Sequence, residues 1–260
     1  MLNRKPILIV LISSIFSLTS VLAQNKKDSL QFNLKMDLSS RRISGTFKQL
    51  VAGGGLELKL RYGNWQLKNN TNYRYNKTNA ILIENNWYDL LRLMYYPYSH
   101  EKLYFGFFYH YDNNLLYRVN SRHQYGTGIG STLDKGLSKL SLIATIGYER
   151  SDYRGSEFVN SNRDFSIREN GLFLFRLDHG IRFPKYGVSI SSRLFYFQSL
   201  AEGADYDLWI NSSVRFKIWR GLSFNIIYDY RFENVHLEAL SNDNDVLLFG
   251  FNLVVGSNAR

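Results

Sequence analysis

The sequence contains no cysteine, and it has no long apolar run after its first 23 residues. Without cysteine the chain has no disulfide framework, no thiolate metal site and no acylated cysteine of the lipoprotein type. The lack of long apolar runs and the mean hydropathy of −0.27 argue against a helical membrane protein. The absence of cysteine also suits an exported β-protein that must stay unfolded across an oxidising compartment.

The N-terminal residues follow the pattern of a secretory signal peptide. Arg4 and Lys5 form a positive segment, Ile7–Leu18 is apolar, and Val21-Leu22-Ala23 offers a cleavage site before Gln24. An uncleaved N-terminal anchor is the alternative, but the apolar run is shorter than the about 20 residues that a membrane span needs. We therefore expect residues 1–23 to be removed and residues 24–260 to form one domain.

Proline is scarce and aromatic residues are abundant: 3 Pro stand against 19 Tyr, 18 Phe and 4 Trp. Transmembrane β-barrels use Tyr and Trp at the two membrane–water levels, where the ring lies in lipid and the polar tip in water. Removal of Arg4 and Lys5 would lower the formal net charge from +10 to +8. In a secreted chain, this charge favours anionic lipid headgroups or an anionic solute as partner, rather than nucleic acid.

Apolar and polar residues alternate through most of the chain. In the first such segment, Leu30–Ser39, every even-numbered residue is apolar and every odd-numbered one polar, which predicts a strand with one apolar face. In Asn85–Pro97 the phase is less certain, because Asp89 shares the apolar face. The remaining ten segments are Leu56–Tyr62, Trp65–Tyr75, Leu103–Tyr111, Gln124–Leu133, Leu140–Arg150, Phe165–Phe183, Val188–Leu200, Tyr206–Ile218, Leu222–Phe232 and Val246–Val255.

Short and long connections alternate between these twelve segments. The short ones are Gly63-Asn64, Tyr98–Glu101, Asp134-Lys135-Gly136, Pro184-Lys185 and Arg220-Gly221, whereas Ser151–Asp164 and Asn234–Asn244 are long and polar. We therefore predict an all-β protein, a single up-and-down antiparallel transmembrane β-barrel of 12 strands. A soluble sandwich or lipocalin-like barrel is the alternative, but its strands usually have about 5–6 residues. Short turns on the periplasmic side would place both termini in the periplasm.

The polar face of such a barrel points into the lumen, so charged residues on that face are the candidate site residues. One interpretation is that opposite charges pair across neighbouring strands as structural ladders. The other is that a basic stripe lines a pore and favours anions. The mixture of signs on single strands favours the ladders. The candidates are Arg61, Arg74, Arg92, Arg193, Arg215, Lys217, Asp229, Arg231 and Glu233.

No motif in the sequence indicates a catalytic or metal site. Gly126, Gly128 and Gly130 lack the lysine and helix of a phosphate loop, so they are expected to make room for large lumen neighbours. The segment Ser241–Asp245 lacks the Gly and Glu of a calcium loop, so we expect it to be the solvated tip of a loop. Arg118 and Arg122 fall in a predicted outer loop. Five histidines lack metal-site spacing and suit hydrogen-bonding roles: His100, His110, His123, His179 and His236.

Two segments resemble a known family. Asn86–Tyr111 has a strand that ends in aromatics, a Pro/Ser turn and then Lys-Leu-Tyr-Phe-Gly-Phe, and Leu140–Arg154 contains Gly147-Tyr148-Glu149-Arg150. Both resemble the salt-induced outer membrane protein family (YdiY-like, of unknown function), over Leu56–Val255. The resemblance implies a bacterial outer membrane β-barrel with no established activity. One departure is that the last aromatics, Phe249 and Phe251, do not end the chain, although the barrel-assembly machinery reads a terminal aromatic in many such proteins.

These patterns predict an outer membrane barrel that is a structural or stress-related envelope protein, or a narrow passive channel. Outer membrane lipids and the barrel-assembly machinery are the expected partners, and no cofactor is expected. A membrane-embedded hydrolase or lipid-modifying enzyme is an alternative, although no G-x-S-x-G motif is present. A binding module that uses the outer loops, chiefly Ser151–Asp164, is another.

Overall fold

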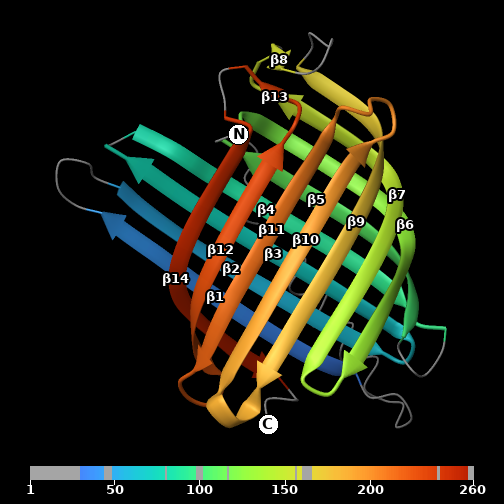
Figure 1. Cartoon of the computed structure of the whole chain (residues 1–260), viewed down its shortest axis with the longest axis vertical. Coiled ribbons are helices and arrows are strands. Elements are labelled where there is room, and N and C mark those ends of the chain that lie inside the picture. Colours follow the sequence, from blue (N-terminus) through green and yellow to red (C-terminus); the bar gives the residue numbers. More distant parts are fainter. Residues whose placement is uncertain are drawn as a thin grey trace, which may run out of the picture.

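The computed structural model describes residues 30–43, 49–79, 81–97, 102–115, 117–155, 157–159, 166–238 and 241–256. Within these residues, twelve antiparallel strands form a closed barrel (Figure 1). No helix of the described chain is long and apolar enough to cross a membrane. In barrel order the strands are β1 (Gln31–Ile43), β14 (Asp243–Gly256), β12 (Leu222–Glu233), β11 (Tyr206–Lys217), β10 (Val188–Ser199), β9 (Ile167–Phe183), β7 (Ser138–Tyr153), β6 (Val119–Lys135), β5 (Leu103–Asn114), β4 (Ile81–Tyr95), β3 (Trp65–Thr78) and β2 (Gln49–Tyr62).

The predicted fold class and the twelve-strand barrel are confirmed. Each strand pairs with the next along the chain, and β1 pairs with β14 to close the ring. The strands have 12 to 17 residues, more than the about 9–11 that a tilted strand needs to cross a bilayer. Several begin earlier or end later than predicted, as β2 does when it starts at Gln49 rather than Leu56. The predicted signal peptide lies outside the described residues.

One end of the barrel carries the short turns, and we call it the turn side; the other is the loop side. Gly63 and Asn64 join β2 to β3 as predicted, and the 3-10 turn Pro184–Tyr186 joins β9 to β10. The turn between β6 and β7 was predicted at Asp134-Lys135-Gly136. Asp134 and Lys135 still belong to β6, so this prediction was wrong by two residues, and the turn is formed by Gly136 and Leu137. Gly136 has φ +62°, a left-handed conformation that glycine adopts without strain. The predicted turn Tyr98–Glu101 lies outside the described residues.

The outer surface of the barrel is apolar, with aromatic pairs near both ends. Trp65 and Tyr95 lie 4.9 Å apart near the turn side, and Tyr73 and Trp87 lie 4.9 Å apart toward the loop side. Between these levels, large apolar side chains such as Phe107 and Ile146 are exposed. An apolar band between two aromatic girdles is the surface that a bilayer covers. Asp89 also faces outward, where it accepts hydrogen bonds from Asn69 and Thr71 on β3.

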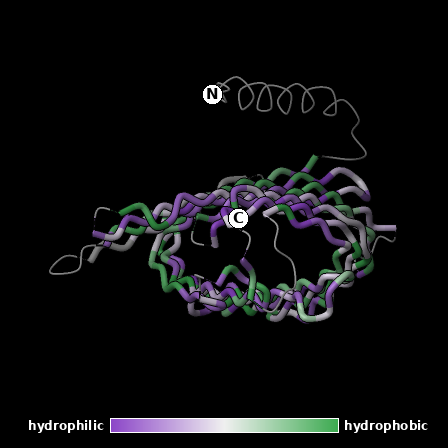
Figure 2. The backbone as a smooth tube through the Cα atoms, turned by 90° about the horizontal axis from the view of Figure 1, so that it is seen from above, coloured by the Kyte–Doolittle hydropathy of each residue, from purple (hydrophilic) through white to green (hydrophobic). Residues whose placement is uncertain are grey.

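The barrel is flattened (Figure 2). Side chains fill one part of its lumen. Five buried apolar side chains from β4, β5, β9 and β10 meet inside it: Leu90, Phe108, Leu172, Leu174 and Phe195. We call these residues the apolar plug. Tyr88 and Trp209 pack against them. The plug joins the two walls of the barrel at this place, and polar residues occupy the rest of the lumen.

The glycines of β6 make room inside the barrel, as predicted. A Cβ atom on Gly130 would lie 2.2 Å from Cζ of Tyr104, and one on Gly126 would lie 2.8 Å from Cε1 of Phe108. A side chain at Gly130 would displace the ring of Tyr104, and one at Gly126 would also meet the backbone oxygen of Ile146 at 2.5 Å. Gly126 thereby lets a member of the apolar plug lie against the wall of the barrel.

The long loops hold a small sheet above the loop side of the barrel. Two segments predicted as loops contain short strands, β8 (Phe158–Val159) and β13 (His236–Leu237), which pair with each other (Figure 1). Leu237 is buried against Tyr117, Val119 and Tyr153, and Phe158 packs on this cluster. We call β8 and β13 the loop-side cap. Ser151–Asp164 and Asn234–Asn244 were predicted as long polar loops, and the short strands and the buried apolar residues within them were not foreseen.

Candidate functional site: the charged lumen

The open part of the lumen contains a cavity of about 290 Å³. Its lining includes Lys35, in the turn-side half of β1, and Asn244, at the loop-side end of β14. Residues from every barrel strand except β7 and β9 contribute to it. The cavity therefore runs along the barrel beside the apolar plug, and its walls are polar because the inner face of each strand carries the polar residues of the alternating pattern.

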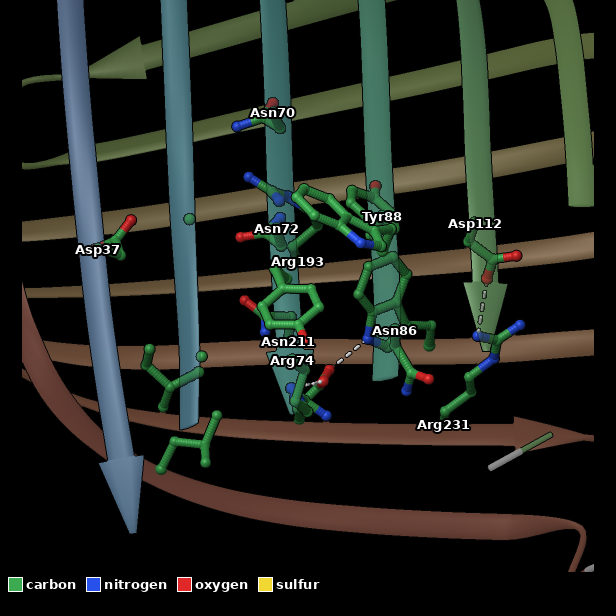
Figure 3. Close-up of a pocket in the computed structure, with 18 of the residues that line it drawn as sticks. Asp37, Asn70, Asn72, Arg74, Asn86, Tyr88, Asp112, Arg193, Asn211 and Arg231 are labelled. Atoms are coloured by element: carbon green, nitrogen blue, oxygen red, sulfur yellow. Dashed lines mark hydrogen bonds and ion pairs between the residues drawn. The ribbon is translucent and has the colours of Figure 1, made fainter. Parts of the chain in front are cut away.

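Ion pairs cross this cavity between opposite walls. Arg74 on β3 donates a hydrogen bond to Asp229 on β12, with 2.7 Å between Nη2 and Oδ2. Arg231 on β12 reaches Asp112 on β5, with 3.4 Å between Nη1 and Oδ2 (Figure 3). These strands are not neighbours in the barrel. The predicted pairing across neighbouring strands is present at Arg193 and Asp178 on β10 and β9, but the cross-lumen pairs were not predicted.

A network of eight buried or half-buried charged residues fills the loop side of the lumen. Arg122 is its centre: only 2% of its side chain is exposed, and it lies 3.4 Å from Glu233 and 3.6 Å from Asp207. Its Nη2 also donates to the hydroxyl of Tyr153 at 3.1 Å. The loop-side charge network consists of Arg122, Arg168, Arg231, Asp112, Glu149, Asp205, Asp207 and Glu233.

The network joins the barrel to its loops. Asp205 belongs to the connection between β10 and β11, and its carboxylate lies 2.9 Å from Nη2 of Arg168. Burial raises the pKa of Asp205 to about 6, although the positive charge of Arg168 opposes this shift. Glu149 accepts hydrogen bonds from Gln124 and Ser151, so its charge is held by several donors. Carboxylates that are paired in this way fix the loop-side mouth of the barrel.

The nine predicted lumen charges all lie at inward-facing positions of their strands. Arg74, Arg193, Arg215, Asp229 and Arg231 line the cavity. Arg92 and Glu233 are buried beside it, with 9% and 2% of their surfaces exposed. Arg61 lies near the turn side, with its guanidinium 5.8 Å from the ring centre of Tyr96.

Lys217 takes an inward position opposite Ser223, but it is exposed at the turn-side rim of the barrel. It therefore belongs to the mouth of the lumen and not to the cavity.

Arg122 shows where the sequence analysis failed. The prediction placed Arg122 in an outer loop, whereas it is the most central buried charge of the lumen. If the alternating pattern is extended back from Gln124 by two residues, Arg122 falls on the inner face, opposite Asp112 of the neighbouring strand β5. The loop assignment failed because β6 starts at Val119 and not at Gln124.

Three of the described histidines, His110, His123 and His179, form hydrogen bonds on the barrel strands, whereas Nδ1 of His236 in β13 is buried without a partner among the described residues. His110 bonds to Gln124 at 2.6 Å inside the lumen, and His123 bonds to the hydroxyl of Tyr109 on the outer face. His179 lies 3.2 Å from Oγ of Ser138, outside the barrel near the turn side. No carboxylate of the described chain orients His179, so this pair lacks the third member of a hydrolase triad. His100 lies outside the described residues.

The described residues contain no group of three or more His, Cys, Asp or Glu that could hold a metal ion. At the predicted tip Ser241–Asp245, Oγ of Ser241 donates to Asp243, and β14 begins at that aspartate.

The fold and the lumen together define a membrane-spanning β-barrel with a partly open, charged interior. Residues 28–256 match the family described as "Protein of unknown function, DUF481". The chain belongs to this family, which confirms the resemblance seen in the sequence. A comparison with curated proteins finds no match.

Solved structures of other outer membrane barrels are similar in fold. The NanC porin matches with a TM-score of 0.48 and 8% identity, over 85% of this chain and 98% of that one. An anion-selective porin from Comamonas acidovorans matches with a TM-score of 0.40 and 7% identity, over 88% and 100%. The β domain of the Bordetella autotransporter Brka matches with a TM-score of 0.40 and 15% identity, over 88% and 100%. These similarities concern the fold alone.

Proposed function

We propose that this protein is a narrow passive channel of the bacterial outer membrane, which lets small solutes pass with a preference for anions. The observation that carries the proposal is the polar cavity beside the apolar plug. Its lining extends along the barrel from Lys35, in the turn-side half, to Asn244, at the loop-side end of β14. A purely structural barrel has no need of such a cavity, because side chains of the size of the plug residues would fill it. The plug keeps the passage narrow.

Cations at the turn side supply the preference for anions. Arg215 lines the cavity and donates to the uncharged Asn225, and Lys217 is exposed at the rim. No carboxylate of the described chain forms an ion pair with either residue. A mouth lined by uncompensated positive charge concentrates anions and repels cations.

Recording from planar bilayers tests the proposal. The refolded protein is expected to give discrete conductance steps with anion selectivity. In the double variant Arg215→Ala/Lys217→Ala, the ratio of anion to cation permeability should fall by about a factor of two at 0.1 M salt, and further at lower salt, where charges are less screened. Arg150→Ala, which removes a charge from the outer surface, is the control. Conductance no higher than background would refute the channel.

The orientation is part of the proposal: turns in the periplasm, together with both termini, and the loop-side cap at the cell surface. Short periplasmic turns and longer outer loops are the rule for bacterial barrels. Leu237→Ala tests the orientation, because loss of this buried side chain should release β13 and expose the chain after Arg154 to trypsin. Trypsin added to intact cells is expected to cut the variant and to leave the unchanged protein whole.

The two parts of this prediction fail in different ways. Cleavage of the purified variant without cleavage on intact cells would place the cap on the periplasmic side. If trypsin cuts neither preparation, Leu237 does not hold the cap. Leu247→Ala, at an exposed lipid-facing position, is the matched control and should stay resistant in both.

A further inference from the structure

Cations in the turn-side half of the lumen have fewer carboxylate partners than those of the loop-side half. On the loop side, Arg74, Arg122, Arg168 and Arg231 each form ion pairs. Toward the turn side, Arg176 and Arg193 share the single carboxylate of Asp178, at 2.6 and 3.0 Å. Lys68 and Arg92, which face the same region, have no carboxylate within 4.0 Å among the described residues.

Four basic residues of this half form two pairs of neighbours on opposite walls of the lumen. Lys68, Arg92, Arg176 and Arg193, from β3, β4, β9 and β10, form what we call the lumen basic cluster. Lys68 lies directly opposite Arg92 in the sheet, and Arg176 and Arg193 both donate to Asp178. Glu57 lies near the first pair, where it accepts a hydrogen bond from Asn70.

Arg92 has a hydrogen-bond donor without an acceptor. Its Nη2 donates to Oδ1 of Asn70 at 2.7 Å, but its buried Nε has no partner among the described residues. A buried charged group that is neither paired nor fully hydrogen-bonded is strongly disfavoured. An anion beside Arg92 would supply both the missing acceptor and the missing charge.

Of the cluster, Arg193 lines the cavity itself, and Arg92 is connected to it through Asn70. Arg193 and Asn70 line the cavity, and 32% of the Arg193 side chain is exposed within it (Figure 3). The same cavity is bordered by the rings of Tyr88 and Trp209 and by Leu248. A solute in the cavity therefore meets the guanidinium group of Arg193 and apolar side chains that line the same cavity.

We propose that the lumen basic cluster binds the carboxylate of a small organic acid, whose hydrocarbon part lies against Tyr88, Trp209 and Leu248. The planar fork of a guanidinium matches a carboxylate with two parallel hydrogen bonds. A cavity of about 290 Å³ is at the lower limit for ligand sites, so the acid has only a few carbon atoms. The inference rests on the proposed function only in that the acid must reach the lumen.

Isothermal titration of the refolded protein in detergent micelles tests the site without need of conductance. Sodium butyrate is expected to bind with saturation, whereas butylamine is not expected to bind. Inorganic phosphate should bind about tenfold more weakly than butyrate, because it gains nothing from the apolar wall. Arg92→Gln and, separately, Arg193→Gln should each weaken butyrate binding about tenfold to a hundredfold, because each removes a charge-assisted hydrogen bond.

Arg150→Gln on the outer surface carries the same change of charge and should bind butyrate unchanged. If the Arg92 variant does not refold, as judged by its mobility on gels, the half-exposed Arg193 provides the decisive comparison. Butyrate binding that persists in the variants overturns the site. Equal binding of phosphate and butyrate overturns the assignment to an organic acid. Binding without conductance refutes the channel alone, and conductance without butyrate binding refutes this site alone.

Discussion

Replacement of Arg122 by methionine is expected to lower the free energy of unfolding by about 3–5 kcal/mol, the cost of breaking a buried ion pair by removal of one partner. Methionine fills much of the space of arginine but leaves Glu233, Asp207 and Glu149 without their central cation. These carboxylates are themselves buried, so water cannot replace the lost charge without opening the loop side. Unfolding by urea in phospholipid vesicles, followed by tryptophan fluorescence, measures the effect.

Arg150→Met is the matched control, because it removes the same group from a pair on the outer surface. Arg150 lies 3.4 Å from Glu169, but 60% and 48% of the two side chains are exposed. An exposed pair contributes about 0–1 kcal/mol, so this variant should unfold almost as the unchanged protein does. Equal stability of the Arg122 and Arg150 variants would contradict a structural role for the network.

A second change separates lost charge from lost packing. If Arg122→Met destabilises the barrel because Glu233 is left unpaired, then Glu233→Gln in the same chain should recover part of the stability. Arg231, the other partner of Glu233 at 2.6 Å, would remain to bond the amide oxygen. No recovery in the double variant would assign the effect to packing instead.

Inward-facing charges were predictable because side chains on a strand alternate with a period of two. Once Leu222, Phe224 and Ile226 are assigned to the lipid, Asp229 and Arg231 must face the lumen, and the structure places them there. The same rule holds for Arg74 on β3. The strand count, the closing of the barrel and the role of the β6 glycines follow from equally local patterns.

Which charges meet inside the lumen could not be predicted. Arg74 and Asp229 are 155 residues apart and lie on strands that are not neighbours. Their contact depends on how far the barrel is flattened, and the apolar plug determines this by bringing β4 and β5 against β9 and β10. No pattern within one strand carries that information. The loop-side cap could not be predicted either, because two-residue strands are too short to show alternation.

The distribution of charge and bulk within the lumen links the fold to the proposed channel. The plug closes the part of the lumen next to β9, and the loop-side charge network rigidifies the mouth on the loop side. What remains is the cavity, which every barrel strand except β7 and β9 lines and which Arg193 and Asn70 border. In the proposed channel, a solute that passes the mouth would therefore meet Arg193 of the lumen basic cluster.

The seam between β1 and β14, where the first and last strands of the barrel pair, is expected to be the most sensitive part of barrel assembly. Gly250 lies opposite Ser39 in this seam. A Cβ atom on Gly250 would lie 2.1 Å from the carbonyl oxygen of Leu38 and 2.8 Å from Cα of Ser39. Both are backbone atoms, so no side-chain rotation relieves the clash, and β1 must move away from β14.

Gly250→Ala is therefore expected to destabilise the closed barrel by about 1–3 kcal/mol or more, the usual cost of overpacking, and to lower the yield of folded protein. The shift in gel mobility between folded and heat-unfolded samples measures this yield during refolding into vesicles. Gly180→Ala on β9 is the matched control, because the nearest atom to its added Cβ is the oxygen of Ile190 at 3.9 Å. Refolding of both variants with equal yield would show that β1 can shift and still close the ring. A loss confined to Gly250→Ala would show that closure depends on close approach of the two terminal strands.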